Sequence, residues 1–238
     1  LLHSSFLLPF FICSSFVNRP INVDNVKILR YNIDTVKIGG AVMEKRPYHH
    51  KNLKNDLIEK GIELVNENGI NQLSLRKVAQ ACNVSHAAPY SHFSNKDELL
   101  QEMQLHITKQ FTAVLQDTVS KYSGTPDFLL EFGKAYISFF ISHPQYFNFL
   151  FQQGNIQIDL DIGSDKESNY QPFAIYKEQV LDLLAGTNIT QSKKEDLIIA
   201  LFAYVQGLTA LATMKNVHYS FKWEDKLADL IGIFGCEF

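Results

Sequence analysis

The apolar residues of this chain recur mainly at steps of three and four, which is the period of an α-helix rather than of a strand. The first clear run predicts a helix over residues 51–68, and Gly69 is expected to end it with Ile70 closing back on the last turn. One face of this helix carries Leu53, Leu57, Gly61, Leu64 and Val65. We expect that face to pack against the segment that follows.

Residues 74–92 predict two short helices joined by a tight turn. Ser74 suits the N-cap of the first helix, and Asn83 stands where the chain must reverse, because asparagine enters the left-handed region at low cost. Ser85 is expected to cap the second helix, which continues through residue 92. The inward face of the first helix holds Val78, Ala79 and Cys82. The small Ala79 would let the two helices cross closely, as a helix-turn-helix requires.

A long third helix is predicted over residues 95–122, with Ser94 and Asp97 forming a capping box at its start. Its apolar residues keep the helical spacing: Leu99, Leu100, Met103, Ile107, Phe111 and Val114. Gly124 and Pro126 are expected to end it, with Pro126 at the first position of the next helix. This helix would leave the helix-turn-helix and enter the rest of the protein.

The remaining pattern predicts helices over residues 127–142, 170–184, 192–214 and 223–234. Ser192 and Glu195 are expected to cap the third of these, and a proline at position 144 interrupts the chain after the first. Residues 152–168 are polar and read as a surface loop, since their aspartates lack the spacing and closing glutamate of an EF-hand. The pattern therefore predicts an all-α fold.

The segment VAQACNVSHAAPYSHFSNKDELL, residues 78–100, resembles the DNA-binding signature of TetR/AcrR-type transcriptional regulators. The resemblance is close over residues 52–103 and holds only in outline elsewhere. Two positions depart from the family pattern: Asn83 replaces a glycine, and Pro89 replaces a branched apolar residue. A proline near the start of a helix loses one backbone bond, so we expect strain but not breakage.

The resemblance implies a three-helix DNA-binding unit with a helix-turn-helix over residues 43–98, and a helical ligand-binding and dimerisation domain over residues 99–238. Charge agrees with such a division. Residues 43–100 hold eight lysines and arginines against seven acidic residues, whereas residues 101–238 hold ten against sixteen. A weakly basic end on an acidic body suits a protein that places one end on phosphate.

Residues 1–42 differ from the rest. Their apolar run is broken by Pro9, lacks a basic n-region and is too short for a spanning helix. We interpret them as an extra segment outside the natural fold, with Met43 as the natural start. Three scattered cysteines indicate a reducing compartment, so a cytoplasmic protein without a membrane segment is expected.

Candidate DNA contacts cluster around the helix-turn-helix. By resemblance, Tyr90, His92 and Lys96 match family positions that contact the DNA backbone, and their polar groups can donate to phosphate oxygens. His86, Ala87 and Ala88 should face base edges, where alanine methyls suit the methyl of thymine. Ser74 and Arg76 complete the candidate set; Arg76 could reach a phosphate or a base, or simply remain solvated.

The resemblance also implies a ligand pocket and a dimer interface in the second domain. An aromatic set could line the pocket, although plain core packing is an equal alternative: Phe132, Tyr136, Phe139, Phe140, Tyr146, Phe147 and Phe151. The last two helices carry more apolar surface than one face needs, and a four-helix bundle between two copies would cover it. The candidate interface residues are Leu201, Tyr204, Leu208, Leu211, Leu227, Leu230 and Phe234.

No catalytic or metal-ligand constellation is recognisable, and no cofactor is expected. The sequence therefore predicts a one-component regulator, by family habit a repressor, which binds palindromic operator DNA as a homodimer and is released by a small apolar or aromatic ligand. Two alternatives remain open. One is a helical enzyme or carrier with a vestigial DNA-binding unit; the other is a DNA-binding structural protein without a ligand.

Overall fold

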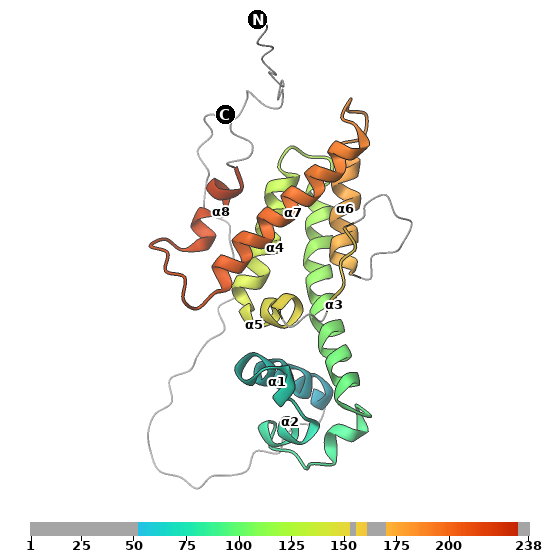
Figure 1. Ribbon diagram of the computed structural model, residues 1–238, viewed down its shortest axis with the longest axis vertical. Coiled ribbons are helices and arrows are strands. Elements are labelled where there is room, and N and C mark those ends of the chain that lie inside the picture. The colour runs from blue at the N-terminus through green and yellow to red at the C-terminus, as the bar shows by residue number, and fades with distance from the viewer. Residues whose placement is uncertain (1–51, 153–155, 161–169, 233–238) are drawn as a thin grey trace, which may run out of the picture. The chain divides into compact units, whose positions relative to one another are not determined.

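The computed structural model describes residues 52–152, 156–160 and 170–232, and every regular element in these ranges is helical (Figure 1). The all-α prediction is confirmed. The described residues lie in one compact unit, Lys51–Cys236. The expectations for residues 1–42, for Met43 and for Phe234 concern positions outside the described residues.

Helix α1, Leu53–Asn68, forms where the first apolar period predicts it, and it buries the predicted face around Leu57 and Val65. Gly69 ends the helix with a φ of 80°, and its N–H donates to the Val65 carbonyl at 2.8 Å. Glycine suits this left-handed position because it has no Cβ to clash. A short 3₁₀ turn, η2 (Ile70–Gln72), follows.

Helix α2, Leu75–Ala81, begins at the predicted cap, where the Ser74 hydroxyl accepts a hydrogen bond from the Lys77 N–H at 3.3 Å. After it the chain reverses at Asn83, which has a φ of 56°. Among the described residues this is the only non-glycine residue with positive φ. The predicted turn chemistry is confirmed at both positions.

The second helix of the pair differs from the prediction. Instead of an α-helix over residues 85–92, the structure has turns followed by the 3₁₀ helix η3, Ala88–Ser91, with Pro89 buried as its second residue. Proline cannot donate the backbone bond that would join it to the preceding turn, and its ring disfavours α geometry at the residue before it. The expectation that Pro89 would leave the α-helix intact is therefore wrong.

Helix α3, Lys96–Tyr122, has the predicted length but a different cap. Asn95 is the N-cap, and its side chain accepts from the Glu98 N–H at 2.9 Å. Glu98 in turn accepts from the Ser94 N–H at 2.6 Å. The predicted Ser94–Asp97 box is thus shifted by one residue, because asparagine caps as well as serine and glutamate reaches back farther than aspartate.

The remaining helices follow the predicted order. They are α4 (Phe128–Ser142), α5 (Pro144–Phe147), the π-helical turn η4 (Asn148–Gln152), α6 (Gln171–Leu183), α7 (Gln191–Thr213) and α8 (Trp223–Gly232). Two boundaries are corrected. Thr190 rather than Ser192 caps α7, accepting from the Lys193 N–H at 3.4 Å, and Pro126 precedes α4 instead of opening it.

Helix α3 connects the two parts of the described unit, as Figure 1 shows. Its first turns contact α1, and its later turns contact α4 and α6. We call residues 52–98 the head, and residues 111–122 of α3 together with helices α4 to α8 the body. Within the body, α4 contacts α7 and α8 as well as α3, so α4 is its central helix.

Candidate functional site

The exposed surface of the head is formed by α2, the Asn83 turn and η3. Arg76 on α2 and His86, Ala87 and Tyr90 around η3 are exposed, whereas Ala88 is half-buried. The Tyr90 ring is 52% exposed, a large fraction for an aromatic side chain. Behind this surface Val78, Ala79 and Pro89 are buried, so the exposed side chains stand on a packed base.

Three other candidate residues have contacts within the head. Ser74 caps α2, and His92 is half-buried with its ring 6.1 Å from that of Phe93. The Lys96 ammonium donates to the Ile70 carbonyl at 2.6 Å and so joins the start of α3 to η2. An ammonium has three hydrogens, so this contact leaves two for other acceptors.

The candidate pocket residues form a cluster of rings in the body. Phe111 of α3 lies at its centre, with ring centroids 4.9 Å from Tyr136, 4.9 Å from Phe139 and 4.8 Å from Phe140. All seven candidates are buried except Phe151, which is half-buried against Phe147. The structure therefore brings these residues together as packed core.

Three buried hydroxyl groups on α3 and α4 have no hydrogen-bond partner among the described residues, those of Thr108, Thr112 and Tyr136. Thr112 and Tyr136 are 6% and 5% exposed. Burial raises the pKa of Tyr136 well above its ordinary value, so its hydroxyl keeps its proton. Leaving a buried hydroxyl unpaired is unfavourable by about 1–3 kcal/mol, so these atoms mark a place where a polar group of a ligand would be stabilising.

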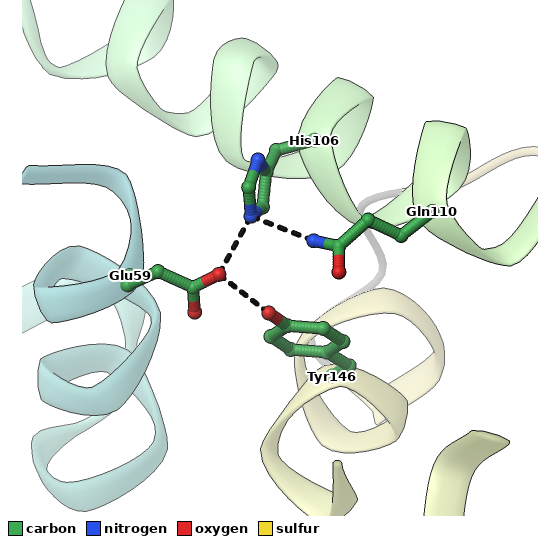
Figure 2. A network of polar contacts seen from close by, with 4 residues as sticks. All are labelled: Glu59, His106, Gln110 and Tyr146. Atoms are coloured by element: carbon green, nitrogen blue, oxygen red, sulfur yellow. Dashed lines mark hydrogen bonds and ion pairs between the residues drawn. The ribbon is translucent and has the colours of Figure 1, made fainter. Parts of the chain in front are cut away.

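Tyr146 has a role that the sequence did not reveal. Its hydroxyl donates to Glu59 Oε1 at 2.6 Å, and the same oxygen lies 2.6 Å from His106 Nε2 (Figure 2). The Gln110 amide nitrogen lies 2.7 Å from that ring nitrogen. Tyr146 and Glu59 are 87 positions apart in the chain, so no local pattern could pair them.

The candidate dimer residues divide into two groups. Leu208 and Leu227 are only 9% and 1% exposed, so they pack inside a single chain rather than toward a second copy. The Tyr204 hydroxyl donates to the Leu230 carbonyl and joins α7 to α8. Leu201 is half-buried, and Leu211 is 45% exposed.

Helix α7 has a second apolar face that the described residues leave uncovered. At helical spacing this face holds Ile199, Ala203, Gly207, Leu211 and Met214, all of them exposed. A Cβ added to Gly207 would meet no atom within 4 Å. In the described part of the chain, α7 is the one helix long and apolar enough to cross a bilayer, and 17% of its most apolar window is buried.

Within the described ranges no group of three or more histidine, cysteine, aspartate or glutamate side chains could hold a metal ion. Cys82 is buried, with its thiol 3.6 Å from the Asp56 carbonyl, and burial raises the pKa of the thiol. It is therefore a packing residue of the head rather than a nucleophile.

Comparison with known proteins finds similarity to transcription regulators in the head. Residues 57–103 match the family described as bacterial regulatory proteins, tetR family. An HTH-type transcriptional regulator of Haemophilus influenzae is 40% identical over 53 residues, which are 22% of this chain and 28% of that regulator. The match thus spans less than a third of the curated relative.

Solved structures extend the likeness to the body. A TetR-family transcriptional regulator from Haemophilus influenzae has a TM-score of 0.53 and 21% identity, covering 75% of this chain and 93% of that one. The regulator FadR from Bacillus subtilis, in complex with stearoyl-CoA, has a TM-score of 0.55 and 15% identity, covering 74% and 96%. At these identities the likeness shows a shared helical fold.

Proposed function

We propose that this chain is a cytoplasmic transcription regulator of the TetR family, which binds operator DNA through its head and is controlled by a small molecule in its body. One observation carries the proposal: residues 57–103 match the tetR family of bacterial regulatory proteins, and they include α2, the Asn83 turn and η3, where the sequence predicts a helix-turn-helix. By the habit of the family we propose a repressor.

In this proposal the turn before η3 and η3 itself read the DNA. His86, Ala87 and Ala88 face base edges, and Tyr90, His92 and Arg76 contact the backbone. Lys96 keeps its bond to Ile70 and donates a second hydrogen to phosphate. Ser74 supports this surface by capping α2. The reading segment is a single 3₁₀ turn, so few side chains reach the bases.

The experiment that tests DNA binding starts from a random-sequence library. The full-length protein should enrich a two-fold symmetric site, and no enrichment would contradict the proposal. On that site, Lys96→Ala should weaken binding to all sequences similarly and reduce the salt slope by about one. Lys215→Ala, which changes an exposed lysine of the body, is the matched control and should leave the slope unchanged. His86→Ala should instead change the preferred sequence.

We propose a homodimer that covers the exposed face of α7. A second copy is the occupant this face fits, because small residues at Ala203 and Gly207 let two helices approach closely and a two-fold axis pairs the same patch with itself. Dimerisation also places two heads on half-sites about 34–36 Å apart, or a multiple of that. Leu211 belongs to the proposed interface, whereas Leu208 and Leu227 support it from inside.

Sedimentation tests the dimer. The double variant Ala203→Glu, Leu211→Glu should be monomeric with unchanged helical content, because both side chains already face solvent within one chain. Leu105→Glu changes a leucine of α3 that is 44% exposed and should leave assembly intact. A double variant that remains dimeric would place the interface elsewhere, and a wild-type protein that is monomeric and binds vesicles would show that the face of α7 meets a membrane surface instead.

The effector we propose is largely apolar with one polar group. The rings around Phe111 supply apolar contacts, and the Tyr136 and Thr112 hydroxyls supply the polar ones. A related fold carries stearoyl-CoA in FadR, which makes a long acyl chain the first compound to try. Stearoyl-CoA should raise the melting temperature of the wild-type protein more than coenzyme A alone does. Equal shifts would exclude the acyl chain as the recognised part.

A further inference from the structure

We propose that Glu59, His106 and Tyr146 form a polar latch that sets the angle between the head and the body. In this latch Tyr146 is the positioning residue, because it is the member carried by the body. The contacts of the latch all lie within one chain. Only the role of the latch in passing a signal from the effector to the operator-binding head rests on the proposed function.

The latch joins three separate helices at one carboxylate oxygen. Glu59 comes from α1 in the head, His106 from α3, and Tyr146 from α5 in the body (Figure 2). Both contacts to Glu59 Oε1 are 2.6 Å long. An oxygen held by donors from two other helices resists both rotation and sliding of α1, which a single contact would not do.

The protonation states of the two end groups make the Tyr146 bond a strong one. Burial acts to raise the pKa of Glu59, but hydrogen bonds from His106 and Tyr146 and the charges of His106 and His143 outweigh it and lower the pKa. Burial and the bond to Glu59 raise the pKa of Tyr146 above its ordinary value. A neutral phenol therefore donates to a carboxylate, and such charge-assisted bonds are about twice as strong as neutral ones.

The other polar contacts of α1 would hold the head less firmly. Lys54 and Glu102 pair at 2.8 Å between α1 and α3, but their side chains are 43% and 31% exposed, and exposed ion pairs contribute little. Asn148 of η4 donates to Asn66 at 2.7 Å, which is a neutral bond. The Glu59–Tyr146 bond, by contrast, joins α1 to the body through a carboxylate.

Tyr146 also touches the aromatic cluster of the body. Its ring stacks on His143, with centroids 4.9 Å apart and planes 10° apart, and it lies 6.1 Å from the Phe139 ring. His143 Nδ1 lies 3.0 Å from the Phe139 carbonyl at the end of α4. A ligand that displaces the rings of α4 would therefore move Tyr146, and the Tyr146 hydroxyl would pull on Glu59 in the head.

The test measures the angle directly and needs no DNA. Spin labels are placed on cysteines introduced at two exposed positions, Gln80→Cys in α2 and Glu178→Cys in α6, with Cys13 and Cys236 changed to serine. Labelled full-length chains are diluted with unlabelled protein, so that only distances within one chain are read. The comparison is between the otherwise unchanged protein, Tyr146→Phe and Glu59→Gln.

The matched control removes a tyrosine hydroxyl at another position of the chain. Tyr176→Phe deletes a hydrogen bond of 2.7 Å to the Ile198 carbonyl, which lies entirely within the body. We expect a broader or shifted distance distribution for Tyr146→Phe and Glu59→Gln, and an unchanged one for Tyr176→Phe. The double variant Tyr146→Phe, Glu59→Gln should add little to the effect of either single change, because both weaken the Tyr146–Glu59 bond.

Operator binding supplies the second readout. Loosely held heads must be ordered at the correct spacing when DNA binds, so Tyr146→Phe should bind the selected operator about tenfold more weakly, with Tyr176→Phe unchanged. If Tyr146→Phe keeps the distance distribution of the wild type, the latch is overturned. If the wild type binds no DNA, the proposed function fails, while the distance measurement still decides whether the latch exists.

Discussion

The head and the body are both helical, but they satisfy their polar groups differently. In the head, Ser74 and Asn95 cap α2 and α3, Glu98 accepts from the Ser94 N–H, and Lys96 donates to the Ile70 carbonyl. In the body, the Thr112 and Tyr136 hydroxyls are buried without a partner among the described residues, and one face of α7 is apolar and exposed. The body therefore has features that a ligand and a second copy would complete, whereas these polar groups of the head find partners within it.

The largest loss of stability that we predict comes from a change at the centre of the body. Phe111→Ala removes a ring that contacts Tyr136, Phe139 and Phe140, and it should lower the free energy of unfolding by about 3–5 kcal/mol. Chemical denaturation measures this loss. Phe221→Ala, at a side chain that is 58% exposed, should change stability by less than about 0.5 kcal/mol. A similar loss in both variants would mean that the ring cluster is not the core.

A smaller effect is expected when a cap of the head is removed. Asn95→Ala deletes the acceptor for the Glu98 N–H and should lower the free energy of unfolding by about 1 kcal/mol. Ser94→Ala, one residue earlier, keeps the backbone N–H that donates to Glu98 and removes only an exposed hydroxyl contact to the same carboxylate, so its effect should be smaller. A larger loss for Ser94→Ala than for Asn95→Ala would indicate that Ser94 is the cap, as the sequence predicted.

Tyr136→Phe sharpens the comparison because we expect it to increase stability, whereas the two changes above decrease it. Removing a buried hydroxyl that lacks a partner should raise the free energy of unfolding by about 1 kcal/mol in the absence of ligand. The same change should reduce the thermal shift caused by an effector that uses this hydroxyl. A loss of stability in Tyr136→Phe would show that the hydroxyl is already satisfied.

The smallest predicted effect is the pH dependence of the Glu59–Tyr146 contact, which joins the head to the body. Hydrogen bonds from His106 and Tyr146 lower the pKa of Glu59 in the folded state despite its burial, so the stability that its carboxylate contributes is present above the unfolded pKa and is lost as pH falls through the folded pKa. Part of that lowering comes from the Tyr146 hydrogen bond. The stability gap between wild type and Tyr146→Phe should therefore shrink in acid. A gap independent of pH would exclude an ionised Glu59 from the contact.

The head and the body also differ in how much of their structure could be predicted from the sequence. In the head, local chemistry decides the structure, so the Ser74 cap, the left-handed Asn83 and the Gly69 terminus were predictable. Local ambiguity caused the errors, since neighbouring residues can cap one helix equally well and Pro89 competes with the α pattern around it.

The long-range contacts could not be found in this way. Glu59 and Tyr146 meet only because α1 and α5 pack together, and an aromatic residue at helical spacing gives no sign of its hydroxyl partner. The burial of Leu208 beside the exposed Leu211 depends on which face of α7 meets α4. Both leucines fit the same apolar period, so periodicity alone could not separate them.

The exposed face of α7 has a consequence for how much protein a cell must make. If two copies must join before both heads can meet an operator, then at low abundance the binding species grows with the square of the chain concentration. Halving the amount of protein would then cut operator occupancy about fourfold while occupancy is low. Residues such as Ala203 and Gly207, which are far from η3 along the chain, would thereby set the abundance at which regulation begins.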